Sequence, residues 1–331
     1  MYYRTLGTSG LNVSVIAFGA WQIGDPDFWG ADAEADPDGV VGAAVDAGIN
    51  LFDTAEVYGD GRSEEVLGKA LRGRRDKVYI ASKAFTESCT PEGLRIACEN
   101  SLRRLGTDHI DLYQIHWPFT ASAYEEITPV LQALKTEGKI REIGVSNFGP
   151  EDLDTWMKIG AAVSNQIGYN MLFRAPEYEM LPACRRYDLS ILAYMPLMQG
   201  LLSGRYRQLD DIPMKRRRSR HFAASREGTR HGEPGHEELL SDTLEELSDF
   251  AEAVHVPLAV LSLSWLIAQP GLTSAIVGAR KINQLLANLQ AAELDVGPAA
   301  IAQLNEISYP LKRAMGYNCD MWETDANSRI H

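Results

Sequence analysis

Four ionisable side chains fall at or just after the ends of three consecutive predicted strands: Asp53, Tyr58, Lys83 and His116. A lone tyrosine has a pKa near ~10 and rarely exchanges a proton at neutral pH. A lysine cation beside the phenol is expected to lower that pKa, and a carboxylate would hold the lysine in place and keep it charged. A histidine next to the phenol can orient a carbonyl oxygen or relay a proton.

Each of these residues also has an ordinary structural explanation. Asp53 could cap a loop, Lys83 could be solvated, His116 could be a structural histidine and Tyr58 could simply pack. Their joint placement favours chemistry, because titrating groups with shifted pKa values cluster at functional sites. Together they could protonate an oxyanion as hydride reaches its carbon, or run the reverse reaction. They supply no hydride, so a nicotinamide cofactor must lie alongside.

The elements that must position these residues alternate along the chain. Short apolar runs separated by helical segments predict parallel βαβ units, and eight such units close into a (β/α)8 TIM barrel. A doubly wound sheet is the alternative, but the first strand is followed by residues 19–24, which do not match G-x-G-x-x-G. The predicted strands cover residues 15–18, 51–53, 78–82, 110–116, 140–146, 164–167, 190–194 and 274–277. The predicted helices cover residues 37–47, 63–71, 91–105, 124–137, 150–159, 178–186, 239–254 and 257–268.

Three segments lie outside the repeating units, within what we interpret as a single domain spanning residues 1–331. The first eleven residues, with Gly7 and Gly10 around a turn, predict a β-hairpin that caps the bottom of the barrel. A long insertion, about residues 200 to 236, follows the seventh strand. A C-terminal helix and a tail, residues 315–331, complete the chain.

Composition narrows the function classes. The chain has 331 residues with 32 Lys and Arg against 45 Asp and Glu, a net charge of −13. An acidic surface repels phosphate backbones, so nucleic acid is not expected as a partner. The four cysteines fit neither a disulfide framework nor a zinc site, and no secretory signal or membrane span is visible. These features predict a cytoplasmic protein, with homo-oligomerisation left open.

Three motifs resemble the aldo-keto reductase family, in particular bacterial members related to potassium-channel β-subunits. They are residues 51–59 (LFDTAEVYG), 102–112 (LRRLGTDHIDL) and 138–148 (GKIREIGVSNF). They occur in the family's order, which makes the match specific, and the resemblance runs from about residue 3 to 310.

The resemblance implies that Tyr58 is the general acid/base, that Lys83 and Asp53 tune it, and that His116 orients the carbonyl. It also implies NADPH extended across the barrel mouth. The residues that would hold this cofactor are Trp21, Asp53, Ser146, Asn147, Gln166, Tyr194, Met195, Pro196, Leu197, Gly200, Leu202, Arg205, Gly278, Arg280, Gln284 and Asn288. Arg280 near a helix start suits an extra phosphate, hence NADPH over NADH. Met195 replaces the family's usual Ser and Ala287 its frequent Glu, so weaker cofactor binding or some use of NADH is the alternative.

The substrate pocket is expected to involve Trp21, Trp29 and Trp117 with Tyr58 and His116. The tail carries large apolar residues, and we expect it to fold over the barrel mouth or over that of a neighbour. The basic run at residues 215–221 of the insertion either closes over phosphates or an anionic substrate, or is solvated. His231 and His236 are not spaced for a metal site, and no metal is expected.

The leading hypothesis is an NADPH-dependent oxidoreductase that interconverts a small-molecule aldehyde or ketone, or a sugar-like compound, and its alcohol. A redox-sensing regulatory subunit that binds the cofactor with little turnover is the alternative, although no inactivating N-terminal arm is visible. A barrel aldolase that uses Lys83 as a Schiff base is a third hypothesis.

Overall fold

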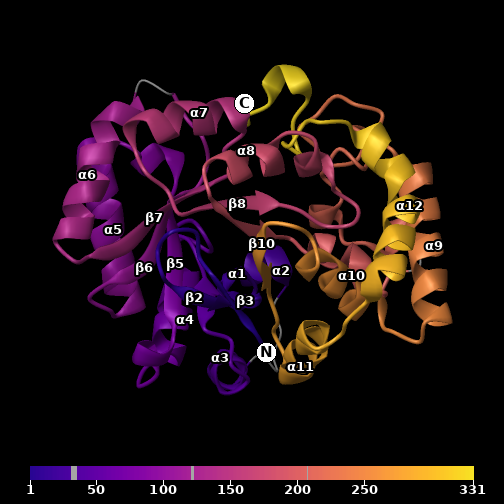
Figure 1. Ribbon diagram of the computed structural model, residues 1–331, viewed down its shortest axis with the longest axis horizontal. Helices are drawn as coiled ribbons and strands as arrows, with labels where there is room; N and C mark the ends of the chain where they lie inside the picture. The colour runs from indigo at the N-terminus through magenta and orange to yellow at the C-terminus, as the bar shows by residue number, and fades with distance from the viewer. Residues whose placement is uncertain (31–35, 121–122, 207) are drawn as a thin grey trace.

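A closed barrel of parallel strands forms the centre of the computed structural model, which describes residues 1–30, 36–120, 123–206 and 208–331 (Figure 1). Among the described residues eight strands close the barrel, in the spatial order β10-β3-β4-β5-β6-β7-β8-β9. The predicted TIM barrel is therefore confirmed. The barrel strands are β3 (Ile16–Gly19), β4 (Leu51–Asp53), β5 (Tyr79–Ala84), β6 (Ile110–Ile115), β7 (Ile140–Ser146), β8 (Ser164–Gly168), β9 (Ser190–Tyr194) and β10 (Leu272–Val277).

The strand boundaries differ from the prediction by two residues or fewer. The largest change near the mouth is in β5, which continues through Lys83 to Ala84 because it pairs with β6 up to Ile115. Lys83 therefore sits on a hydrogen-bonded strand and not in a loop, which restricts the movement of its backbone.

Helices surround the barrel, and α9 and α12 lie side by side on its outside (Figure 1). The helices are α1 (Trp21–Gly24), α2 (Pro26–Trp29), α3 (Pro37–Asp46), α4 (Arg62–Ala70), α5 (Pro91–Leu105), α6 (Tyr124–Thr136), α7 (Pro150–Ile159), α8 (Met180–Arg186), α9 (Glu237–Ala253), α10 (Leu258–Ile267), α11 (Ile282–Leu289) and α12 (Gly297–Met315). Local signals set several ends: the Thr90 hydroxyl caps α5 by accepting from the Gly93 N–H, and Gly106 ends it in the left-handed conformation.

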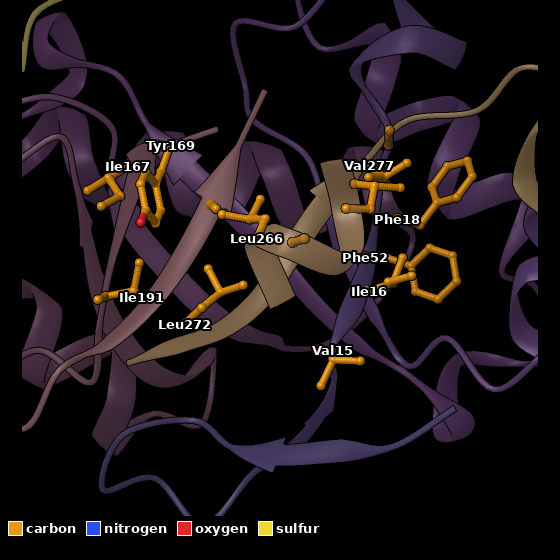
Figure 2. Packing of buried hydrophobic residues seen from close by; sticks show 14 of the residues in the cluster. Val15, Ile16, Phe18, Phe52, Ile167, Tyr169, Ile191, Leu266, Leu272 and Val277 are labelled. Carbon is orange, nitrogen blue, oxygen red and sulfur yellow. The ribbon is translucent and has the colours of Figure 1, made fainter. Parts of the chain in front are cut away.

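Side chains alternate between the barrel interior and the helix layer, as the pleat of a strand requires. Leu51 and Ala81 face the interior, where a separate apolar cluster fills the barrel. Their neighbours Phe52 and Ile80 belong to the larger cluster beneath the helices. Figure 2 shows part of this outer cluster, with Phe18 of β3 beside Phe52 at a ring separation of 5.6 Å.

The predicted hairpin is present, as β1 (Tyr3–Thr5) paired with β2 (Asn12–Ser14). Its turn inserts Leu6 and Leu11 into the interior apolar cluster, so it closes the bottom of the barrel. Gly7 makes the closest approach, because a Cβ there would lie 2.2 Å from the Val163 carbonyl oxygen while φ is +50°. No other residue type fits this position without strain.

The insertion after β9 forms short 3-10 turns, η5 (Met198–Ser203), η6 (Leu209–Asp211) and η7 (Met214–Arg216), before α9 begins. Within the described ranges no single helix is both long and apolar enough to cross a membrane. The pair α9 and α10 taken together reaches the required length and hydropathy, and the two helices are bent by 96° at their junction.

Candidate active site

The alternation of the strands brings Asp53 and Lys83 to the same inner face, two residues beyond Leu51 and Ala81. Both side chains are almost inaccessible, at 4% and 0% exposure. The Lys83 ammonium donates to Asp53 Oδ1 at 2.7 Å and to the Thr54 carbonyl at 2.8 Å, and it lies 3.3 Å from the Tyr58 hydroxyl. The three side chains form one hydrogen-bonded unit, as the residue types suggested.

Tyr58 lies on the loop between β4 and α4, where two close approaches fix its position. Gly59 has φ +58° and passes so near α1 that a Cβ would be 2.5 Å from the Gly24 carbonyl oxygen. The Trp21 ring stacks on Tyr58 with 5.2 Å between centroids, and its indole N–H donates to Asp25 at 2.8 Å. The phenol is therefore held between an aromatic plane and the Lys83 ammonium.

The electrostatics of this unit correct one expectation. Burial, followed by the negative charge of Asp53, raises the pKa of Tyr58 well above its usual value. The lysine does not lower it as expected, because its ammonium pairs more closely with the carboxylate than with the phenol. Burial lowers the pKa of Lys83, and Asp53 opposes that shift. Without bound ligands, Tyr58 is therefore a neutral phenol that can donate a proton at physiological pH.

His116 follows β6 and continues the same inner row, Leu112, Gln114 and His116. Tyr58 and Phe85 contact its ring edge-on, each with 5.6 Å between centroids. Burial, and then the Lys83 charge, lowers the pKa of His116 well below its usual value. The imidazole is therefore neutral near pH 7 and can form hydrogen bonds to an oxygen without carrying charge.

These groups open into a cavity of about 700 Å³ at the barrel mouth. Most of the predicted site residues line it: Trp21, Trp29, Asp53, Tyr58, His116, Trp117, Ser146, Asn147, Gln166, Tyr194, Met195, Pro196, Leu197, Gly200, Arg205, Gly278, Arg280, Gln284 and Asn288. Two predicted residues do not line it. Lys83 is covered by Asp53 and Tyr58, and Leu202, in η5 of the insertion, is fully buried in the outer apolar cluster.

Amide and hydroxyl groups beside the tyrosine form a fixed hydrogen-bonding wall. Gln166 Nε2 donates to the second oxygen of Asp53 at 2.7 Å, and the Tyr194 hydroxyl donates to Asn147 Oδ1 at 2.8 Å. Asn147 has φ +63° and donates through Nδ2 to the His116 carbonyl and to Ser146 Oγ, both at 3.1 Å. This wall suits a planar ring with a carboxamide, lying against the aromatic face of Tyr194.

Five arginines, four from the insertion and one from the segment before α11, also line the cavity: Arg205, Arg216, Arg218, Arg230 and Arg280. Among the described residues none of them forms an ion pair with a carboxylate within 4.0 Å. Burial lowers the pKa of Arg216, and the neighbouring positive charges of Arg280 and Arg205 act in the same direction. Cations that meet no carboxylate within the described part of the chain, in a protein of net charge −13, form an arrangement that suits phosphate groups.

The basic run packs over α2. Arg216 lies 4.9 Å above the Trp29 ring, Arg218 lies 5.5 Å above Phe28, and Lys215 donates to the Asp27 carbonyl at 2.6 Å. The insertion thus covers one side of the cavity through these contacts, and its basic run is not a fully solvated loop. His231 of the same segment is buried, and His236 precedes the first residue of α9.

The tail lies over the mouth of its own barrel, where Trp322 and Arg329 line the cavity. Figure 1 shows the tail in yellow, running from the end of α12 to α7. The Trp322 ring is nearly parallel to that of Tyr194, at 6° and 6.5 Å between centroids, and contacts Trp117 at 6.0 Å. Met321 is fully buried beneath it. Further along, the His331 carbonyl accepts from the N–H groups of residues 151 and 152 at the start of α7.

Reasoning from the sequence missed several lining residues. Phe85 lies two positions after Lys83, so it shares the strand end and could have been found there. Gln22 of α1, Asp25 between α1 and α2, and Tyr206 of the insertion also line it, and no local pattern in the sequence sets the course of these segments. Trp322 and Arg329 belong to the tail, and only tertiary contacts bring them to the cavity.

Comparisons with known proteins agree with this geometry. A model of the aldo/keto reductase family matches residues 15–308. Aldo-keto reductase YhdN of Bacillus subtilis (strain 168) is 35% identical over 301 residues, covering 86% of this chain and 87% of that protein. A probable voltage-gated potassium channel subunit beta of Oryza sativa subsp. japonica is 32% identical over 322 residues, covering 90% and 92%.

A solved structure is also similar to this chain. The crystal structure of an aldo-keto reductase from Klebsiella pneumoniae in complex with NADPH has a TM-score of 0.73 at 30% identity, covering 93% of this chain and 96% of that one. Fold, site and similarity agree on a class of barrel oxidoreductases. The chain belongs to the aldo/keto reductase family, as its motifs indicated.

Proposed function

We propose that this enzyme uses NADPH to interconvert an aldehyde or ketone and its alcohol, with Tyr58 as general acid/base. The observation that carries the proposal is the buried unit of Asp53, Lys83 and Tyr58, with neutral His116 in edge contact, at the base of one large cavity. No nucleophile or metal ligand set is needed for this chemistry.

In the direction of reduction, NADPH supplies hydride to the carbonyl carbon. Tyr58 donates its proton to the carbonyl oxygen, and the raised pKa of the phenol keeps that proton available at neutral pH. The His116 imidazole orients the oxygen, and Lys83 stabilises the phenolate that remains until solvent returns a proton. In the direction of oxidation the phenolate accepts the proton from the alcohol.

The cavity fits an extended dinucleotide. Gln166, Asn147 and Ser146 offer amide and hydroxyl groups for a carboxamide, and Tyr194 offers an aromatic face for the nicotinamide ring. The five arginines of the cavity wall, Arg205, Arg216, Arg218, Arg230 and Arg280, would bind the pyrophosphate and the additional phosphate of NADPH. Met195 and Ala287 both line the cavity, so the two departures from the family pattern would reduce affinity where the cofactor binds.

The test is the variant Tyr58→Phe, compared with Tyr309→Phe on the exposed face of α12. We expect Tyr58→Phe to lose carbonyl reduction by about 10²-fold or more, since a positioned proton donor contributes that much. NADPH binding, followed by nicotinamide fluorescence, should survive. Turnover close to that of Tyr309→Phe would contradict the mechanism.

A regulatory subunit is the second candidate function, because a probable potassium channel subunit is 32% identical to this chain. Such a protein would bind NADPH tightly, turn over every carbonyl very slowly and purify with a partner protein. A single carbonyl class reduced with kcat/KM above about 10⁴ M⁻¹s⁻¹, an ordinary value for enzymes, would favour the reductase.

Schiff-base chemistry at Lys83 is poorly supported. Its Nζ is inaccessible, paired with Asp53 at 2.7 Å and absent from the cavity wall. Borohydride should therefore trap no substrate on Lys83. For the location of the enzyme we propose the cytoplasm, because all four cysteines are free thiols, as a reducing compartment would keep them.

A further inference from the structure

A charged pair in the tail faces the cavity next to the reacting groups. The Arg329 guanidinium lies 3.8 Å above the ring of Trp117, the residue that follows His116. Its Nε and Nη2 donate to the two oxygens of Asp320 at 2.7 and 2.9 Å. Within the described ranges its third nitrogen, Nη1, has no hydrogen-bond partner.

The pair is built rigidly. Asp320 is fully buried and also accepts from the Trp322 N–H at 3.1 Å. Arg220 of the insertion fastens this stretch of tail, since its N–H donates to the Met321 carbonyl at 2.7 Å and its guanidinium donates to the carbonyls of Met315 and Asn318. The tail and the insertion therefore hold Arg329 in one place before any substrate arrives.

The charge of Arg329 is compensated by Asp320. A carboxylate approaching Nη1 would also meet the buried negative charge behind it, whereas a neutral oxygen would not. The cavity wall beside the guanidinium is aromatic, because Trp117 lies under it and contacts Trp322. Next to the reacting groups, Phe85 contacts His116 and Trp21 stacks on Tyr58. Flat or apolar substituents gain most from such walls, and the guanidinium is the cationic donor beside them.

We propose that Arg329 determines substrate specificity, and that the substrate is an uncharged carbonyl compound with a flat or apolar body and a second, neutral oxygen acceptor that binds Nη1. This proposal rests on the reductase function above. It also distinguishes between substrates that the catalytic groups alone would treat alike.

Three para-substituted benzaldehydes of nearly equal shape test it: 4-nitrobenzaldehyde, 4-carboxybenzaldehyde and 4-isopropylbenzaldehyde. They carry a neutral oxygen acceptor, a charged acceptor and no acceptor. The measured quantity is kcat/KM for each, with NADPH saturating. The variants are Arg329→Met, Asp320→Asn and, as a control, Arg313→Met on the exposed side of α12.

A ratio between substrates within one variant cancels partial unfolding, and comparing that ratio with the wild-type ratio cancels the electronic differences between the substrates. In Arg329→Met the nitro-to-isopropyl ratio should fall about tenfold relative to the wild type, the size of one lost hydrogen bond to a charged donor. In Asp320→Asn the guanidinium keeps its charge uncompensated, so the carboxy-to-nitro ratio should rise about tenfold. Arg313→Met should leave both ratios unchanged.

The outcomes separate the two proposals. If the wild type reduces none of the three aldehydes or any other carbonyl, the proposed function fails. If the wild type reduces them but Arg329→Met lowers all three kcat/KM values equally, Arg329 does not select among substrates and the inference is overturned. A wild type that prefers the carboxylate over the nitro compound would also overturn it, because Arg329 would then bind anions.

Discussion

Replacing Asp53 by Asn tests whether the buried lysine depends on its carboxylate. The wild-type pair is at most 5% exposed on either side chain, so solvent does not compensate for a missing partner. Asp53→Asn leaves a buried cation, and breaking such a pair costs about 3–5 kcal/mol. For a chain of 331 residues the melting temperature should fall by about 4–7 °C at pH 6.

The loss should depend on pH. Without Asp53, burial lowers the folded-state pKa of Lys83 further below its unfolded value, so folding disfavours the cation. The stability lost is therefore largest at low pH, where the lysine must be charged, and shrinks as pH rises and the amine becomes neutral. Near pH 10 the remaining loss of stability comes only from weaker hydrogen bonds between the amine and its neighbours, about 1 kcal/mol.

Thermal unfolding of both proteins at pH 6 and pH 10, followed by circular dichroism, measures this difference. The control is Asp154→Asn, whose carboxylate makes an exposed pair with Arg186 at 3.0 Å and should cost little at either pH. A loss for Asp53→Asn that is equal at the two pH values would refute the reasoning, because it would mean that the charge of Lys83 does not determine the cost.

Further predictions concern the pH profile, the barrel bottom and the phosphate end. The pKa of Tyr58 is raised above ~10 and that of His116 is lowered below ~6.5. We therefore expect kcat/KM for reduction to stay constant from about pH 6.5 to about pH 10 and to fall only at higher pH, where the phenol loses its proton. A bell-shaped pH profile centred near neutrality, in stopped-flow or steady-state kinetics, would contradict the assignment. Gly7→Ala should destabilise the fold by about 1–3 kcal/mol in urea unfolding, since its Cβ would meet the Val163 carbonyl, while an unchanged midpoint would mean that the hairpin shifts freely. Arg216→Met should raise the Kd for NADPH about tenfold in fluorescence titration, and an unchanged Kd would place the phosphates elsewhere.

The sequence by itself predicted the barrel and the catalytic set. Alternating strands and helices allow few topologies, and parallel strands bring their carboxyl ends to one edge whatever the loops do. Asp53, Lys83 and His116 therefore meet because each lies at the carboxyl end of its strand, among the alternate residues that face the barrel interior. The two-residue alternation and the order of the strands along the chain are enough to predict this. The hairpin at the bottom of the barrel could also be predicted from the sequence, because Gly7 and Gly10 mark its turn.

Only the tertiary structure decided the electrostatics of the site. That Tyr58 keeps its proton follows from burial and from the closer pairing of Lys83 with Asp53, and both depend on packing between elements far apart in the chain. For the tail, the sequence predicted a cover over a barrel mouth but left open whether that mouth is its own or a neighbour's, and only the tertiary structure decided for its own. Arg329 reaches the cavity because Arg220, more than a hundred residues earlier, binds the carbonyls before it, and no local pattern encodes such a contact. Local propensity and period set the elements, whereas desolvation and long-range hydrogen bonds set what their side chains do.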